Sequence, residues 1–177
     1  MAGLLTWTQK LDEVQRRLGE EVGTPTSPGL DVPYFDRSLD IEPVLLEVSN
    51  AALRELSIEE LGSPAAITPA TGASPIALPT TAVRLVTATI DSAPAVEVEL
   101  ARWIQNENAP AKIFCIQKNN IGNTRVIKHN GTTAAFGFLC EQPLGVWQST
   151  QLLPPAYDER TIAETVQILS IADNLEF

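Results

Sequence analysis

The chain has 177 residues, of which 44% are hydrophobic and 19% are charged, so it can bury a core as one domain or as one domain with an insertion. Acidic residues number 22 against 12 basic ones, and the net charge of −10 argues against a surface that grips nucleic-acid phosphates. This acidic excess either keeps the protein soluble or repels DNA that passes by, and both interpretations stay open.

The first predicted element is an amphipathic helix over residues 4–18, with Thr6 as its N-cap and Gly19 as its stop. Its apolar residues recur at spacings of three and four, which places them on one face. They are Leu4, Trp7, Leu11, Val14 and Leu18. The opposite face is expected to meet solvent or a neighbouring chain through Lys10, Glu13, Arg16 and Arg17. A loop rich in proline and glycine follows over residues 23–33.

A second helix is predicted to start near Ser38 or Asp40, either of which can cap it, and to end near Ser57. Pro43 is tolerated because it falls in the first turn, where no intrahelical donor is missed. One apolar stripe indicates a plain core helix. Its residues are Ile41, Leu45, Val48, Ala52 and Leu56.

A β-rich region follows a boundary at residues 62–79, where Gly, Ser, Pro, Ala and Thr dominate. Five short runs are predicted as strands, namely 83–90, 96–100, 112–117, 124–128 and 133–139. Between the last two lie Asn130 and Gly131, and Asn-Gly accepts the positive φ angles of a tight turn. These two residues therefore predict a β-hairpin turn.

A last helix is predicted from Asp158 to Asn174, after Pro154 and Pro155 fix its approach. Its apolar face includes Ile162, Val166 and Leu169, and Ile168 and Ile171 are expected to broaden this face. The predicted fold class is α+β: a bundle of the N-terminal helices (1–61) and the C-terminal helix (153–177), with an antiparallel β-rich insertion at 62–152. Leu175 and Phe177 either pack locally or dock on another protein.

The sequence predicts no reactive centre, cofactor or metal site. His129 lies beside the predicted turn and is expected to face solvent, and no catalytic motif accompanies it. Asp31, Asp36 and Asp40 lack the alternating ligand positions and central glycine of a calcium loop. The region between the terminal helices is therefore not expected to be an enzyme site.

One outside alternative is a carbohydrate-binding or glycosidase module. It would need a cleft in which Trp103 and Trp147 stack a sugar beside two carboxylates. The available pairs are Glu59 with Glu60 and Glu97 with Glu99. Buried tryptophans and a strand with one face in solvent are the simpler interpretations.

Cysteine content and hydropathy bear on the compartment. Cys115 and Cys140 are too few for a disulfide framework and are expected to be small buried apolar residues. No apolar run approaches the roughly 20 residues that cross a bilayer, and the first residues lack the pattern of a secretory signal. We therefore expect an intracellular origin and no membrane partner.

The order of several segments resembles a known family. These segments are Arg16-Arg17-Leu18-Gly19, Asn50-Ala51-Ala52-Leu53-Arg54-Glu55-Leu56, Ala77-Leu78-Pro79 followed by Val83-Arg84-Leu85, then Trp103, Pro110, Phe114 and Leu153-Pro154-Pro155-Ala156-Tyr157. Together they are similar to the head-to-tail connector adaptors of tailed bacteriophages. The chain departs from that pattern in its proline-rich stretch at 62–79 and its extended loop at 22–35.

The resemblance implies a structural virion protein of the phage neck, assembled in the host cytoplasm and without enzymatic activity. Such proteins form a homo-oligomeric ring, commonly of twelve subunits, that docks on the portal protein. DNA passes through the ring without specific binding, toward a downstream tail or nozzle protein. The implied portal-docking tail is Asp173, Asn174, Leu175, Glu176 and Phe177. A stopper or a tail terminator of the neck is the alternative, although such proteins are usually β-dominated.

Overall fold

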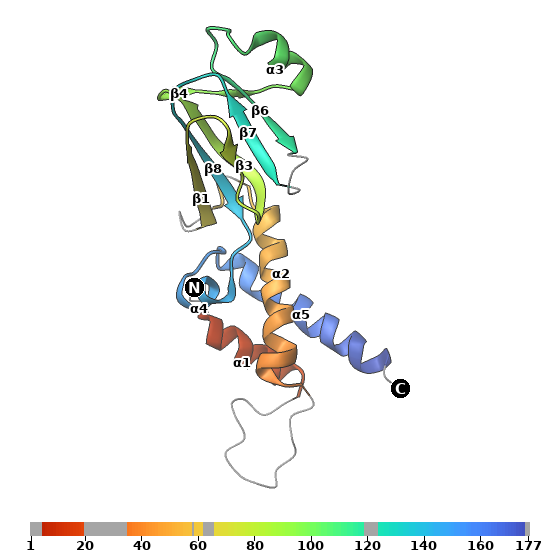
Figure 1. Ribbon diagram of the computed structural model, residues 1–177. Coiled ribbons are helices and arrows are strands. Elements are labelled where there is room, and N and C mark those ends of the chain that lie inside the picture. Colours follow the sequence, from red (N-terminus) through yellow and green to blue (C-terminus); the bar gives the residue numbers. More distant parts are fainter. Residues whose placement is uncertain (1–4, 20–34, 58, 62–65, 119–123, 176–177) are drawn as a thin grey trace. The chain divides into compact units, whose positions relative to one another are not determined.

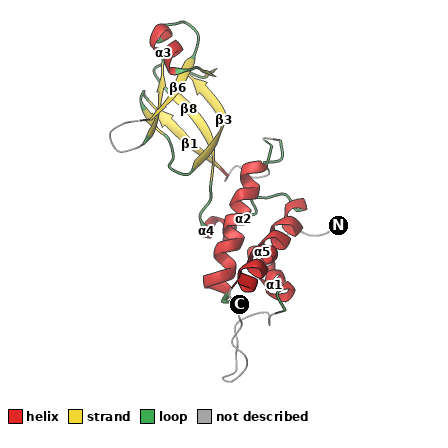
Figure 2. Cartoon of the chain, turned by 90° about the vertical axis from the view of Figure 1, so that its right-hand side faces the viewer, coloured by secondary structure: helices red, strands yellow, loops and turns green. Residues whose placement is uncertain are grey.

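The computed structural model describes residues 5–19, 35–57, 59–61, 66–118 and 124–175, with side chains up to residue 172. Its helices and antiparallel-rich sheets confirm the predicted α+β class (Figures 1 and 2). The chain divides into two compact units. The helical unit comprises Met1–Pro64 and Gln142–Phe177, and the β unit comprises Ala65–Glu141.

Five helical elements build the helical unit. They are α1 (Trp7–Arg17), the π-helix η1 (Arg37–Ile41), α2 (Glu42–Glu55), α4 (Leu144–Ser149) and α5 (Ala156–Leu175). At the start of α1, Thr6 accepts a hydrogen bond from the Gln9 amide while the Gln9 side chain bonds the Thr6 amide. Gly19 follows this helix with φ +81°, which suits a residue without Cβ. The predicted cap and stop of α1 are both confirmed.

Most of the predicted bundle core is buried. The buried residues are Trp7, Leu11, Val14, Ile41, Leu45, Val48, Ala52, Leu56, Ile162 and Leu169. Leu18 and Val166 are half-buried, and Leu4 lies outside the described residues.

The cap of the second helical segment differs from the prediction. Asp36 accepts hydrogen bonds from the backbone amides of Ser38 and Leu39, so Asp36 and not Ser38 or Asp40 caps η1. Asp40 instead accepts a bond from the Asp36 amide. A hydrogen bond from the Ser38 hydroxyl, with those from the two amides, lowers the pKa of Asp36. The prediction chose among capping residues nearer to Pro43, whereas the helical segment begins with a π-helical turn at Arg37.

Residues 142–152, which the sequence analysis assigned to the β insertion, group with the helices. Trp147 packs against Trp7 with ring centroids 6.0 Å apart. Asn50 of α2 binds both backbone groups of Gln142, accepting at 2.9 Å and donating at 3.1 Å. Its Oδ1 also accepts from Trp147 Nε1 at 3.3 Å. This buried amide fixes the returning chain on α2.

Two four-stranded sheets form the β unit. One has the order β1-β8-β3-β4 and the other β2-β7-β6-β5, and only β5–β6 is a parallel pair among the described strands. Their bounds are β1 (Ile67–Gly72), β2 (Ile76–Ala77), β3 (Ala82–Ile90), β4 (Ala93–Pro94), β5 (Val96–Glu97), β6 (Ile113–Lys118), β7 (Arg125–His129) and β8 (Ala134–Cys140). One buried cluster takes Ile90 and Phe136 from the first sheet, and Phe114 and Ile127 from the second. The sheets therefore share a core.

Three strands, β1, β2 and β4, and a short helix in the β unit were not predicted. The proline-rich stretch contains β1 and β2, and the predicted strand at 96–100 gives way to α3 (Leu100–Asn106). Pro69 belongs to β1, which is an edge strand, and lies opposite Gly137 of β8. An edge tolerates proline because one side of the strand has no ladder partner that needs its missing N–H.

The predicted hairpin at Asn130 and Gly131 is wrong. β7 and β8 belong to different sheets, and neither residue has a positive φ. The Asn-Gly signal is local, whereas the Asn130 side chain bonds residues far along the chain. It accepts from the Ile113 amide and donates to the carbonyls of Ala109 and Ala111. The segment is a crossover that Asn130 fastens to the chain before β6.

Candidate functional site

A buried ion pair joins α1 to α5. Lys10 Nζ lies 2.6 Å from Asp158 Oδ1, and their side chains are only 3% and 6% exposed. Asp158 also accepts from the Leu5 amide at 3.2 Å and from Gln151 Nε2 at 3.4 Å. Lys10 was expected on a solvated face, and that expectation is wrong. Its spacing from Trp7 and Val14 already placed it on the apolar stripe.

The charged residues expected to pair with a neighbouring chain have partners within their own chain. Arg17 holds both carboxylate oxygens of Glu159 at 2.7 Å and also bonds Glu13 at 2.9 Å. These bonds raise the pKa of Arg17, while the bond from Arg17 lowers that of Glu159. Arg16 bonds Glu13 as well, and Arg160 bonds Glu55 at 2.7 Å. Such exposed pairs contribute about 0–1 kcal/mol each.

A shallow depression of about 420 Å³ lies beside these pairs on the helical unit. It is lined by Leu5, Gln9, Asp12, Glu13, Arg16, Arg17, Glu159 and Ile162. Its guanidinium groups already hold carboxylates, so the depression offers mixed, largely neutralised charge. This chemistry suits a surface contact with a polypeptide better than a bound ion.

The exposed apolar residues of α5 differ from the prediction. Ile168 and Ile171 were expected to broaden the core face, but they are 43% and 52% exposed. Their spacing of three puts them on one side of the helix. Of the predicted docking tail, residues 173–175 lie within α5 without described side chains, and residues 176–177 lie outside the described part.

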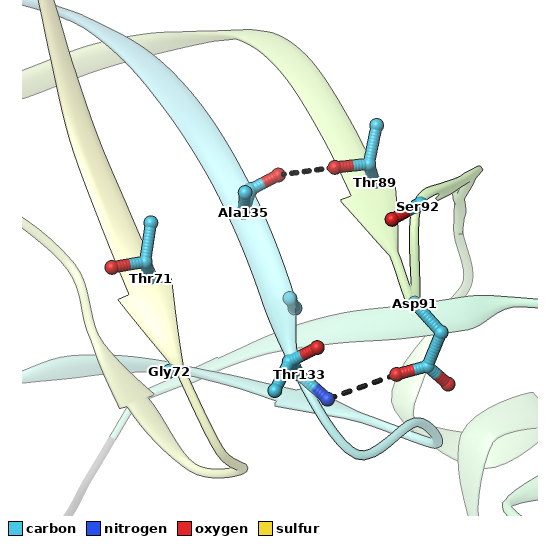
Figure 3. Close-up of a pocket in the computed structure, with 8 residues that line it drawn as sticks. Thr71, Gly72, Thr89, Asp91, Ser92, Thr133 and Ala135 are labelled. Atoms are coloured by element: carbon cyan, nitrogen blue, oxygen red, sulfur yellow. Dashed lines mark hydrogen bonds between the residues drawn. The ribbon is translucent and has the colours of Figure 1, made fainter.

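The β unit has an open depression of about 410 Å³ between β1, β3 and β8 (Figure 3). It is lined by Thr71, Gly72, Thr89, Asp91, Ser92, Thr133, Ala134 and Ala135. In Figure 3, Thr89 Oγ1 donates to the Ala135 carbonyl and the Thr133 amide donates to Asp91. Asp91 is the one ionisable group among these lining residues, and the hydrogen bonds that its carboxylate accepts within the described ranges come from Lys112 and two backbone amides rather than from a hydroxyl of the lining.

Asp91 has a structural task at this depression. Its carboxylate accepts from Lys112 Nζ at 2.7 Å and from the amides of Thr132 and Thr133 at 3.0 and 2.9 Å. The bond from Lys112, followed by that from the Thr133 amide, lowers the pKa of Asp91 to about 2. Asp91 therefore ties the end of β3 to the crossover and to the residue before β6.

The crossover also lies against that carboxylate. A Cβ added at Gly131 would come within 2.1 Å of Ile90 Cγ2 and 2.6 Å of Asp91 Oδ2. Gly131 is therefore required for close approach of the backbone, although not for the positive φ that the turn signal implied.

The tryptophans of the carbohydrate alternative are buried in separate units. Trp103 is 6% exposed and clusters with Val98, Ile113 and Cys115 in the β unit. Trp147 is 4% exposed and belongs to the helical unit. Neither ring offers a face for stacking on a sugar.

The expectation for His129 is wrong, whereas that for the cysteines is confirmed. His129 is 4% exposed, with its ring centroid 6.4 Å from that of Phe136. Its position in β7, two residues from the buried Ile127, places it on the core side of the strand. Cys115 and Cys140 are buried and form no disulfide with each other, and burial raises the pKa of the Cys115 thiol.

The described residues contain neither clustered metal ligands nor a membrane-spanning helix. No group of three or more His, Cys, Asp or Glu side chains there could hold a metal ion. Asp36 and Asp40 serve the start of η1, and Asp31 lies outside the described part. No helix in the described ranges has the length and apolarity needed to cross a bilayer.

No model of a protein family matches the chain, and a search of curated proteins finds no match.

Proposed function

We propose that this protein is a structural component of a phage neck: a ring-forming head-to-tail adaptor that docks on the portal protein and continues the DNA channel toward the tail. The observation that carries the proposal is a helical unit interrupted by a β unit. α1 and α2 precede Ala65–Glu141 and α5 follows it. This layout is the one that the resemblance implies.

The helical content favours an adaptor over a stopper or a tail terminator. Those neck proteins are usually β-dominated, whereas α5 alone has 20 residues and packs with both α1 and α2. The buried Lys10–Asp158 pair helps to hold α1 against α5. Such a unit can present a constant surface to neighbouring subunits in a ring.

Ile168 and Ile171 support the choice of α5 as the docking element. Exposed apolar residues that gather on one side of a helix favour burial against a partner. They lie directly before the predicted docking tail at 173–177, so one continuous segment would enter the portal. The acidic excess would line the DNA passage at least in part and repel its phosphates.

Deletion of residues 173–177 tests the docking tail. The truncated protein should stay folded and lose binding to portal rings, measured by cosedimentation and by circular dichroism. Ile168→Ser with Ile171→Ser should weaken portal binding at least about tenfold, because each buried aliphatic side chain contributes about 1.5–3 kcal/mol. Val83→Ser, an exposed apolar change in the β unit, is the matched control and should not weaken it.

Portal binding by the truncated protein at the level of the full chain would contradict the docking tail. The same result for the double serine variant would remove α5 as the docking element. A monomeric state of the isolated chain decides little, since ring formation can require the portal as a template.

A further inference from the structure

The charge of this protein is divided between its two units. The helical unit contains 17 acidic and 6 basic residues, a net charge of −11, whereas the β unit contains 5 acidic and 6 basic residues, a net charge of +1. The whole acidic excess therefore belongs to one unit. A near-neutral β unit with local positive charge can attract the helical unit of another copy.

The positive charge of the β unit includes a cross-strand pair of like charges. Lys118 at the end of β6 lies directly opposite Arg125 at the start of β7, and both side chains are exposed. Two like charges at opposed positions of an antiparallel pair destabilise it. Lys128 lies three residues further along β7, on the opposite face of the strand, and does not belong to this pair.

No carboxylate relieves this repulsion in the part of the chain that the structure describes. Ion pairs are found there for Lys10, Arg16, Arg17, Arg37 and Arg160 of the helical unit and for Lys112 of the β unit, but for neither member of the cross-strand pair. An acidic surface brought against it would remove the repulsion and add attraction.

We propose that the Lys118–Arg125 pair docks on the acidic helical unit of a second copy of this chain. The contact is head-to-tail: the basic strand pair of each copy binds the helical unit of the next copy, and its own helical unit binds the strand pair of the copy before it. A contact between two different surfaces of one chain generates a ring when the rotation closes. The inference rests on the proposed ring and names the surfaces that would join its subunits.

Exposed carboxylates are available on the helical unit. Glu47, Glu55, Glu59 and Glu164 are exposed, and Arg160 lies 2.7 Å from Glu55 and 4.0 Å from Glu164. Duplex DNA is a different partner for a basic strand pair. The second copy is favoured because its complementary charge is 11 units on one unit, whereas the two cations of the strand pair make a weak phosphate surface.

Zero-length cross-linking of mixed copies tests this contact. Unlabelled and nitrogen-15-labelled full chains are mixed at high concentration, with and without portal rings, and treated with a carbodiimide that joins lysine to carboxylate. Mass spectrometry should find mixed-isotope links from Lys118 to acidic residues of the helical unit. Raising the salt to 0.5 M should reduce these links at least about fivefold, because exposed charges are then strongly screened.

A charge reversal gives the second measurement. Lys118→Glu with Arg125→Glu should weaken self-association at least about tenfold at 50 mM salt in sedimentation velocity, since like charges across an interface disfavour docking. Arg102→Glu is the control, because Arg102 is an exposed cation of α3 in the same unit. It should leave association within about twofold of the original protein.

Links confined to one isotope, or no link from Lys118 to the helical unit, would overturn the inference. So would equal effects of the strand-pair reversal and the Arg102 control. Binding of duplex DNA that the reversal abolishes would assign the strand pair to nucleic acid instead. Rings that form normally with the reversed pair would refute this contact and leave the proposed ring standing. A head-to-tail contact in a chain that does not bind portal rings would support the contact and contradict the proposed adaptor function.

Discussion

Replacement of Lys10 by methionine should strongly destabilise the helical unit. The substitution leaves Asp158 buried, and from the described residues its carboxylate then accepts bonds only from the Leu5 amide and from Gln151 at 3.4 Å. Removing one member of a buried ion pair costs about 3–5 kcal/mol, because the remaining charge is uncompensated. Folded domains have only about 5–15 kcal/mol of stability, so this loss is a large part of the total.

Urea unfolding followed by tryptophan fluorescence measures the loss. A Trp103→Phe background leaves Trp7 and Trp147, which both lie in the helical unit with ring centroids 6.0 Å apart. With a slope of about 2 kcal/mol per M, a loss of about 3 kcal/mol lowers the urea midpoint by about 1.5 M. Because Trp7 belongs to α1, the fluorescence of Trp7 and Trp147 reports on the unfolding of α1.

Two variants control this experiment. Arg16→Met removes the exposed partner of Glu13 from the same helix and should cost at most about 0.5 kcal/mol. Lys10→Met combined with Asp158→Asn removes both buried charges and keeps an acceptor for the Leu5 amide, so it should recover at least half of the loss. If the Lys10 variant costs no more than the Arg16 variant, the buried pair does not hold α1 on α5.

Two further predictions concern the β unit. The pKa of Asp91 is about 2 in the folded protein, below its ordinary value of 3.8, so the stabilisation that its carboxylate gives the fold is complete above about pH 4 and is lost as the pH falls toward 2. Asp91→Asn should lower the urea midpoint at pH 7, measured by Trp103 fluorescence. It should also flatten the dependence of the urea midpoint on pH between pH 2 and 4. An unchanged slope would show that this carboxylate does not stabilise the crossover. Gly131→Ala should lower the free energy of unfolding by about 1–3 kcal/mol, because the new methyl group meets Ile90. Gly145→Ala is the control and should not lower it, because a Cβ there meets open space. Equal urea midpoints for the two variants would count against close packing at the crossover.

The helices were largely predictable from the sequence, because their buried faces repeat at the helical period. The exceptions are residues whose burial depends on a partner rather than on polarity. Lys10 is buried because Asp158 meets it, and no local pattern names that partner. Thr161 and Thr165 are fully buried on α5, where their hydroxyls bond carbonyls of the preceding turn. Counting apolar residues therefore misplaced the buried face of α5 toward Ile168 and Ile171.

The β unit was predictable as short strands but not as sheets. Strand composition is local, whereas pairing depends on residues far along the chain. The Asn130-Gly131 signal favoured a hairpin, yet Asn130 is used to bond the segment before β6. Pro69 argued against a strand, and only the edge position of β1 makes it acceptable. The Lys118–Arg125 pair depends on a register that no single run of residues discloses.

The β unit begins and ends on paired strands: Ile67 of β1 lies opposite Leu139 of β8. Once the sandwich has folded, only the residues between α2 and β1 and those between β8 and α5 still separate the two helices. Shortening a loop of roughly 100 residues to one of roughly 26 lowers the entropic cost of closing it by about 1 kcal/mol. A sandwich that forms first thus lowers the entropic cost of bringing α2 and α5 together, before these helices make a contact of their own.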